Sequence, residues 1–256
     1  MAKVSLSGRK IWLTGASSGI GRAVAKELVR RQALVAASGR NVAALQELAA
    51  ECGSDRLLPV PFDATDRSAT LAAAQTAHGK LGGLDIAFFN AGTCEYVDPK
   101  RFDSRLFERV VHTNFLSMIY GIEAALPLLR QSPHPHLVGM SSTVAYGCLP
   151  RAEAYGATKA AIKYMLESLR LDLLPERIPV SVVCPGFART PLTDLNDFPM
   201  PFRVEVDEAA RVIADGIARQ DPEIHFPKRF SIPFKLLAML PASLYNRVAA
   251  KMVRPS

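Results

Sequence analysis

The feature that most constrains the fold is a short apolar run that ends in a glycine-rich turn and leads into a helical pattern. Lys10–Leu13 is typical of a buried strand, and the residues at 14–21 are Thr-Gly-Ala-Ser-Ser-Gly-Ile-Gly. Ile20, Val24 and Leu28 then recur at helical spacing. A strand, a glycine turn and a helix in this order form the context in which a dinucleotide pyrophosphate binds, because glycines allow close backbone approach and a helix N-terminus favours an anion. The alternative is an ordinary flexible turn before an amphipathic helix, which the two flanking elements disfavour.

The alternation of strand and helix continues along the chain. Strands are predicted at 33–38, 56–62, 84–89, 136–140, 179–184 and 223–226, and helices at about 41–51, 66–78, 104–129, 152–174 and 207–218. This alternation predicts an α/β fold with a doubly wound, Rossmann-like parallel sheet that has helices on both faces. We expect residues 1–227 to form a single dinucleotide-binding catalytic domain, followed by a basic C-terminal extension at 228–256.

Polar residues at the carboxyl ends of the strands are candidate site residues, because ligands of such sheets bind there. Thr14, Arg40, Asp63 and Asn90 each follow a predicted strand. The acid that holds the ribose of NAD is missing, since no Asp or Glu occurs at 28–46. An arginine at the position of Arg40 suits a 2′-phosphate instead, which favours NADP(H) over NAD. The alternative is an exposed loop arginine without a ligand.

A serine, a tyrosine and a lysine form the second group of candidates. Ser142 follows the 136–140 strand, and Tyr155 and Lys159 lie four residues apart on the predicted helix 152–174, so the latter two share one face. An ammonium near a phenol lowers the phenol's pKa from its usual value of about 10, which makes the pair a credible acid/base unit. The alternative for Tyr155 is a helix tyrosine with a satisfied hydroxyl. Asn114 is unfavourable inside a helix, so it either marks a kink or takes part in chemistry.

Taken together, these motifs resemble the short-chain dehydrogenase/reductase superfamily in order and spacing over about the first 220 residues. They are the turn at 14–21, Asn-Ala-Gly at 90–92, the Ser142/Tyr155/Lys159 set, and Pro-Gly-Phe-Ala-Arg-Thr at 185–190. The resemblance implies hydride transfer between NADP(H) and a small-molecule carbonyl or alcohol, with a catalytic tetrad of Asn114, Ser142, Tyr155 and Lys159. Tyr155 would exchange the proton and Lys159 would lower its pKa and bind the nicotinamide ribose. Ser142 would bind the substrate oxygen, and Asn114 would orient a water.

The resemblance also implies a cofactor site. Its residues would be Gly15, Ser17, Ser18, Gly19, Ile20 and Gly21 at the pyrophosphate, Arg40 and Asp63 at the adenosine, Asn90, Ala91 and Gly92 along its ribose, and Tyr155, Lys159, Pro185, Gly186 and Thr190 with Ile20 around the nicotinamide. Gly39 occupies the place of the acid found in NAD-dependent members. The intact tetrad indicates a working enzyme; the alternative is a catalytically silent nucleotide-binding sensor or scaffold of the same fold. A homodimer or homotetramer is expected, partly through the helices at 104–129 and 152–174.

The stretch at 187–206 lies where this family has a mobile substrate lid. Phe198, Met200 and Phe202 either wall an apolar pocket or pack the lid onto the domain. We therefore expect an apolar substrate. The Tyr-to-Lys spacing favours a carbonyl/alcohol reaction over enoyl reduction, for which related enzymes use a longer gap.

The net charge of +7 is concentrated in the C-terminal extension. No acid follows Glu223, whereas six basic side chains occur after residue 227: Lys228, Arg229, Lys235, Arg247, Lys251 and Arg254. From Ser243 on, Leu244, Val248 and Met252 recur every four residues beside a basic face. Such a helix can lie on an anionic membrane surface, dock on a partner subunit or cover the substrate pocket.

Several other functions are disfavoured. Four scattered cysteines, Cys52, Cys94, Cys148 and Cys184, indicate neither a metal site nor a disulfide framework. A nearly neutral body without a recognition motif argues against nucleic-acid binding. The N-terminal residues lack a secretory signal, and no run of 18 apolar residues occurs, so we expect a cytoplasmic protein with membrane association only through the tail.

Overall fold

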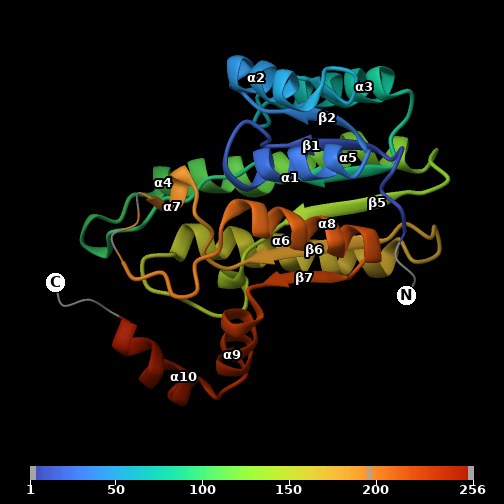
Figure 1. Cartoon of the computed structure of the whole chain (residues 1–256). Coiled ribbons are helices and arrows are strands. Elements are labelled where there is room, and N and C mark those ends of the chain that lie inside the picture. The colour runs from blue at the N-terminus through green and yellow to red at the C-terminus, as the bar shows by residue number, and fades with distance from the viewer. Residues whose placement is uncertain (1–3, 195, 197, 253–256) are drawn as a thin grey trace.

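Parallel strands form one seven-stranded sheet in a computed structural model that describes residues 4–194, 196 and 198–252 (Figure 1). The strand order is β3-β2-β1-β4-β5-β6-β7, and every paired strand is parallel to its neighbour. The strands are β1 (Lys10–Thr14), β2 (Leu34–Ser38), β3 (Leu57–Pro59), β4 (Ile86–Phe89), β5 (His136–Met140), β6 (Val180–Pro185) and β7 (Glu223–Phe226). The predicted doubly wound α/β fold is confirmed. The order reverses between β1 and β4, and the crevice at such a switch point is where ligands of this fold bind.

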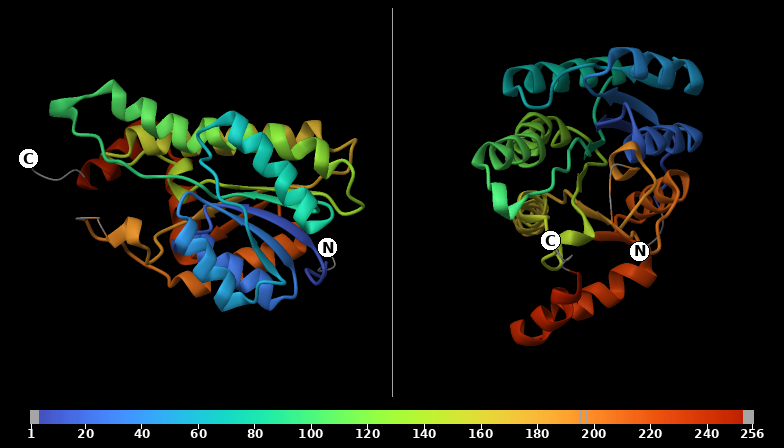
Figure 2. Two further views of the ribbon diagram at one scale, coloured as in Figure 1. Left: turned by 90° about the horizontal axis from the view of Figure 1, so that it is seen from above. Right: turned by 90° about the vertical axis from the view of Figure 1, so that its left-hand side faces the viewer.

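Helices cover both faces of the sheet (Figure 2). One face packs against α1 (Gly19–Arg30), α2 (Val42–Cys52) and α8 (Val206–Arg219). The other packs against α3 (Arg67–Leu81), α5 (Ser117–Leu129) and α6 (Glu153–Asp172). The remaining helices are α4 (Ser104–Val111), α7 (Pro191–Asp194), α9 (Lys228–Ala238) and α10 (Ala242–Ala249), with short turns η1 (Pro99–Arg101), η2 (His112–Leu116), η3 (Thr143–Ala145) and η4 (Ala250–Met252). Among the described residues no helix is both long and apolar enough to cross a bilayer.

Strand β1 shows how the sequence makes two cores. Side chains alternate across a strand, so Ile11 and Leu13 join the core under α1, whereas Trp12 joins the core on the opposite face. The Trp12 indole N–H donates to the hydroxyl of Ser38 (2.9 Å), which satisfies the one polar group of a fully buried ring. An apolar run with both faces covered is what a central parallel strand requires.

The structure departs from the sequence-based prediction at two helices. The single helix predicted at 104–129 is instead α4 and α5, separated by a π-helical turn, η2, which contains Asn114. Helix α9 was not predicted, and Pro233 lies inside it. The predicted helix from Ser243 corresponds to α10 and η4, and Arg254 lies outside the described residues.

Two leucines of α6 provide a matched test of the packing. Leu166 is fully buried against the sheet, whereas Leu171 is 67% exposed. We expect Leu166→Ala to lower the free energy of unfolding by about 2–5 kcal/mol, because it leaves a cavity. Leu171→Ala should change it by less than about 0.5 kcal/mol. Urea unfolding followed by circular dichroism measures both, and equal losses would contradict this packing of α6.

Candidate active site

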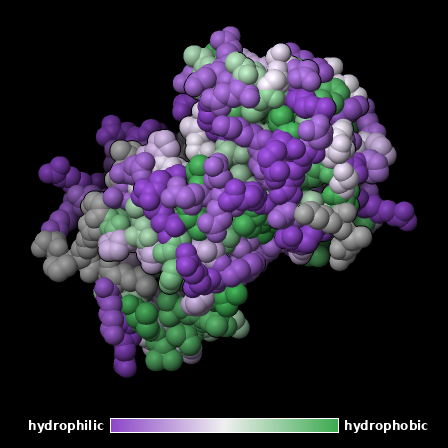
Figure 3. Space-filling model, in the orientation of Figure 1, coloured by the Kyte–Doolittle hydropathy of each residue, from purple (hydrophilic) through white to green (hydrophobic). Residues whose placement is uncertain are grey.

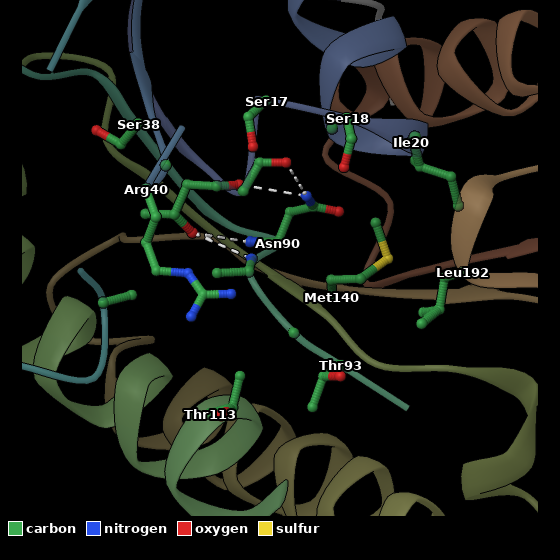
Figure 4. A pocket seen from close by; sticks show the side chains of 18 of the residues that line it. Ser17, Ser18, Ile20, Ser38, Arg40, Asn90, Thr93, Thr113, Met140 and Leu192 are labelled. Atoms are coloured by element: carbon green, nitrogen blue, oxygen red, sulfur yellow. Dashed lines mark hydrogen bonds between the residues drawn. The ribbon is translucent and has the colours of Figure 1, made fainter. Parts of the chain in front are cut away.

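A cavity of about 520 Å³ opens at the carboxyl ends of the strands, around the switch point between β1 and β4. Nearly all the predicted cofactor residues line it: Gly15, Ser17, Ser18, Gly19, Ile20, Gly21, Arg40, Asp63, Asn90, Ala91, Gly92, Tyr155, Lys159, Pro185 and Thr190. Arg40 lies at one end, and Met140 and Leu192 lie at the other, with Asn90 between them (Figure 4). The structure thus brings residues from at least seven separate segments of the chain to one elongated cavity.

Asn90 ties the end of β4 to the glycine turn. Its side-chain nitrogen donates to the carbonyl oxygens of Thr14 (3.2 Å) and Gly15 (3.0 Å), as Figure 4 shows. The Thr14 hydroxyl in turn accepts from the backbone N–H groups of Asn90 and Ala91 (3.1 and 3.3 Å). Asn90 was predicted to line the adenosine ribose; it does line the cavity, but its amide nitrogen is engaged by the chain itself.

The glycine turn is so close to its neighbours that side chains do not fit. Gly15 has φ +68°, and a β-carbon on it would lie 2.8 Å from the backbone of Ala91. A β-carbon on Gly21 would lie 2.0 Å from the carbonyl oxygen of Gly15. Helix α1 begins at Gly19, so its N-terminus faces the cavity beside these residues. An open cradle next to a helix N-terminus fits a pyrophosphate.

Arg40 lies two residues after the end of β2, and Asp63 lies four residues after the end of β3. Arg40 is exposed, lines the cavity, and has no carboxylate within ion-pair distance among the described residues. Asp63 accepts from the backbone N–H and the hydroxyl of Thr65 (2.9 and 2.8 Å), and these bonds, together with the charge of Arg40, lower the pKa of Asp63. The Arg40 guanidinium is therefore available to an anionic group in the cavity.

Tyr155 and Lys159 project from α6 toward the cavity as their four-residue spacing predicts. Lys159 is buried, and its Nζ donates to the carbonyl oxygen of Met140 (3.1 Å) and lies 5.6 Å from the centre of the Tyr155 ring. Burial lowers the pKa of Lys159 to about 8, because the charged form loses hydration. The ammonium remains the main form at neutral pH.

The expected lowering of the Tyr155 pKa is corrected by the structure. Desolvation raises the pKa of Tyr155 above its usual value, and the Ser142 hydroxyl, which hydrogen-bonds the phenol, opposes that shift. The reason is that Tyr155 is desolvated while Lys159 points its ammonium at Met140. Tyr155 is therefore a protonated phenol at neutral pH. Ser142 does not itself line the cavity, although it lies beside Tyr155.

Asn114 acts as a cross-link between chain segments. It is fully buried in the π turn, where its Oδ1 accepts from the N–H of Thr93 (2.7 Å) and its Nδ2 donates to the Thr93 carbonyl and the Thr158 hydroxyl (3.0 and 3.1 Å). A β-carbon on Gly92 would lie 3.1 Å from Asn114 Oδ1 and 3.5 Å from Lys159 Nζ, so the two groups approach the same point. Asn114 marks the break in the predicted helix, and it lies just behind the cavity wall.

Some cavity residues were missed from the sequence. Met140 ends β5, Ser141 follows it, and Leu192 lies on α7; all three line the cavity. The rule that ligands bind at strand ends also points to the first two. Gly186 was predicted and does not line the cavity; its N–H donates to the Phe226 carbonyl (2.7 Å). No group of three or more His, Cys, Asp and Glu side chains able to hold a metal occurs in the described part of the chain.

The lid region packs against aromatic neighbours. Phe198 lies 5.5 Å from Tyr96 and 6.0 Å from Phe187, measured between ring centres, and Phe187 lies 5.6 Å from Phe230 of α9. Phe202 is exposed and lies under the Arg229 guanidinium (5.0 Å). An aromatic row therefore joins the lid to the C-terminal extension.

Helix α10 lies close to the loop before α6. The Tyr245 hydroxyl donates to the carbonyl oxygen of Cys148, and a β-carbon on Gly147 would lie 2.8 Å from that hydroxyl. This loop lies between Ser142 and Tyr155 in the sequence, so α10 is placed beside the segment that joins these two candidate residues.

The parallel sheet has a glycine cradle at its switch point, and Ser142 after β5 lies beside Tyr155 on α6, one turn before Lys159. This combination is typical of a dinucleotide-binding oxidoreductase. The model of the short chain dehydrogenase family matches residues 9–197, and the chain belongs to this family. Its members act on CH–OH and C=O groups with NAD(P).

Three similar proteins agree with this assignment. The chain is 35% identical to an uncharacterized oxidoreductase of Myxococcus xanthus (strain DK1622), over 96% of this chain and 98% of that protein. It is 30% identical to an uncharacterized oxidoreductase of Staphylococcus haemolyticus (strain JCSC1435), over 75% and 84%. It is also 30% identical to 11-beta-hydroxysteroid dehydrogenase 1A of Arabidopsis thaliana, over 93% and 73%.

The glycine cradle can be tested with two equivalent substitutions. Gly21→Ala should abolish detectable NADPH binding and destabilise the protein, because the new methyl group would overlap the Gly15 carbonyl. Gly79→Ala, in an exposed turn of α3 with nothing within 4 Å, should leave binding unchanged and stabilise the fold by up to about 1 kcal/mol. Fluorescence titration and thermal unfolding measure the two effects. Normal NADPH binding by the Gly21 variant would remove the cradle from the cofactor site.

Proposed function

We propose that the protein is an NADP(H)-dependent oxidoreductase that transfers a hydride between the cofactor and the carbonyl or carbinol carbon of an apolar small molecule. The observation that carries the proposal is the pairing of Tyr155 and Lys159 in a cavity whose other end contains the glycine cradle and Arg40. An acid/base unit and an anion-binding unit share one elongated space, as reduction of a carbonyl by a bound dinucleotide requires.

In this proposal the cofactor and the side chains each supply one part of the reaction. A bound nicotinamide supplies or accepts the hydride. In reduction, Tyr155 donates its phenolic proton to the substrate oxygen, and Ser142 hydrogen-bonds that oxygen as negative charge develops. The ammonium of Lys159 stabilises the phenolate that Tyr155 becomes. In oxidation, the phenolate accepts the proton back. A phenol is protonated at neutral pH, and desolvation, which raises the pKa of Tyr155 further, strengthens that preference.

Asn114 has a narrower part in this scheme than its place in the tetrad implies. Both of its amide N–H groups are engaged by Thr93 and Thr158. To orient a water that passes protons from Lys159 to solvent, Asn114 would have to use a lone pair of Oδ1 or its main-chain groups. Its side chain also fixes the Thr93 segment against α6, which keeps the backbone of Gly92 beside Lys159.

The cofactor would be held by the residues that form the cavity wall. The turn at 15–21 would hold the pyrophosphate, Arg40 the 2′-phosphate, Asp63 the adenine side and Asn90–Gly92 the adenosine ribose. Lys159, Pro185, Gly186, Thr190 and Ile20 would surround the nicotinamide and its ribose. The preference for NADP(H) is supported by the exposed and unpaired guanidinium of Arg40 and by Gly39 in the place of an acid.

The substrate, assembly and location follow as further parts of the proposal. Met140 and Leu192 in the cavity wall support an apolar substrate, and the Arabidopsis relative is named for hydroxysteroids. Exposed Tyr164 and Leu171 on α6 support a homodimer or homotetramer through this helix. Residues 1–227 would be the catalytic unit, with the lid at 187–206 and the extension at 228–256. The cytoplasmic location stays a prediction.

Replacing the proton donor tests the mechanism. Tyr155→Phe should lower kcat for carbonyl reduction by at least about 10²-fold, the contribution typical of a positioned acid, while NADPH still binds. Tyr164→Phe on the exposed side of the same helix is the control and should turn over normally. The measurement is loss of NADPH absorbance with a panel of ketones and aldehydes. Near-normal turnover by Tyr155→Phe would refute the mechanism; NADPH binding without turnover by the wild type would indicate the silent sensor.

Arg40 tests the cofactor preference. Arg40→Ala should weaken NADPH binding by about 10-fold or more, because a charge-assisted bidentate contact to a phosphate is lost. NADH binding should change little, since it has no 2′-phosphate. Fluorescence titration with both nucleotides gives the ratio. An equal loss for the two would place Arg40 outside the 2′-phosphate site.

A further inference from the structure

The outward side of α9 and α10 is an apolar surface. Six large apolar side chains are between 38% and 80% exposed there: Ile232, Leu236, Met239, Leu240, Leu244 and Val248. We call these residues the C-terminal face. Figure 3 shows hydrophobic residues gathered at the lower end of the molecule, where Figure 1 places α9 and α10. Contiguous exposed apolar surface of this kind marks an interaction site in most proteins.

Contacts with the domain fix the orientation of α9 about its own axis. The exposure of its apolar side chains therefore does not result from a poorly packed helix. On its inner side Phe234 is buried, Ser231 hydrogen-bonds His225 (2.7 Å), and Lys235 forms an ion pair with Glu223. Ile232 and Leu236 each follow one of these anchored positions and must therefore point outward. The helix has its polar and aromatic anchors inside and its aliphatic side chains outside, which is the reverse of an ordinary surface helix.

The charged side chains beside the apolar residues of α10 and η4 are basic. Arg247 and Lys251 are exposed, four residues apart, and have no acidic partner among the described residues. They follow Leu244 and Val248 by three residues each, Arg247 on α10 and Lys251 on η4 directly after it. No acidic residue follows Glu223 in the sequence. The partner of this face must therefore offer both an apolar phase and negative charge.

We propose that the C-terminal face docks on an anionic membrane surface, with its apolar side chains below the headgroups and Arg247 and Lys251 among them. Apolar residues flanked by lysine and arginine are what interfacial helices use on such membranes. A second copy of this chain fits less well. A two-fold contact brings the same patch of both copies together and would oppose like charges without any carboxylate to offset them.

The docking face adjoins the lid region and the loop before α6. Phe230 of α9 contacts Phe187, Arg229 lies over Phe202 of the lid, and Tyr245 of α10 binds the loop at Cys148. A docked molecule would hold its lid next to the bilayer. Delivery of an apolar substrate from the lipid phase follows from this placement, and it rests on the proposed function.

Vesicle sedimentation tests the docking without any turnover, so its failure is distinguishable from failure of the proposed function. The full chain is mixed with vesicles of phosphatidylcholine, alone or with about 30% phosphatidylglycerol. We expect binding to the anionic vesicles that is weakened by added salt. The double variant Leu236→Ser/Met239→Ser should bind at least about tenfold more weakly, because it loses two apolar side chains that would be buried in the bilayer.

Matched variants separate this face from the general surface. Leu174→Ser replaces a leucine that is 63% exposed, against 61% for Leu236, and should bind as the wild type does. Arg247→Gln/Lys251→Gln should lose most of the preference for anionic vesicles. Lys100→Gln/Arg101→Gln, at exposed positions of η1, should keep it. Unchanged circular dichroism spectra verify that each variant is folded.

Three results would overturn the proposal. The first is equal pelleting of the wild type with and without anionic vesicles. The second is a loss of binding in the Leu174 control equal to that of the Leu236/Met239 variant. The third is a dimer, seen by analytical ultracentrifugation, that needs Leu236 and Met239 and forms without any vesicle binding. That result would make a second copy of this chain the occupant of the face.

Discussion

The hydrogen bonds from Asn90 to the glycine turn are the constraint on which the site depends. They join the ends of β1 and β4 at the one place where the strand order reverses, so two loops become a single wall. The contact is possible only because Gly15 and Gly21 leave no side chain in the way. Since the amide nitrogen of Asn90 is engaged by Thr14 and Gly15, an anion in the cradle must be held mainly by the turn, by Ser17 and Ser18, and by the N-terminus of α1.

Burial sets the protonation states of the acid/base pair in opposite senses. The same loss of hydration lowers the pKa of Lys159 and raises the pKa of Tyr155, so that at neutral pH a cation lies beside a neutral phenol. In the proposed reaction this state would suit proton donation, although a phenol with a raised pKa gives up its proton less readily. The Ser142 hydrogen bond and the Lys159 charge would then stabilise mainly the phenolate as it forms. In that proposal the acid and base roles belong to the pair and its surroundings.

Local patterns predicted most of the fold and the site, and the failures share one physical origin. The glycine turn and the Tyr155/Lys159 spacing are short-range features, and both appear in the structure where they were expected. The π turn at Asn114 depends on hydrogen bonds to Thr93 and Thr158, which are distant in the sequence. Helix α9 was missed because Pro227 and Pro233 are typical of loops, whereas its anchors lie on β7. The direction of the Tyr155 pKa shift depends on tertiary burial, which no spacing in the sequence reveals.

The C-terminal extension lies outside the part of the chain that the family model matches, yet its Phe230 contacts Phe187, just after β6. The anchors of α9 on β7 leave it no freedom to turn its aliphatic side inward, because Lys235 would then lose Glu223 and Ser231 would lose His225. A buried or half-buried polar group without its partner costs more than an exposed leucine. The exposed apolar side is therefore a consequence of how the helix is held, and the same helix holds the aromatic row behind the lid. Whatever covers that side therefore also packs on the helix that holds Phe187 and the lid region in place.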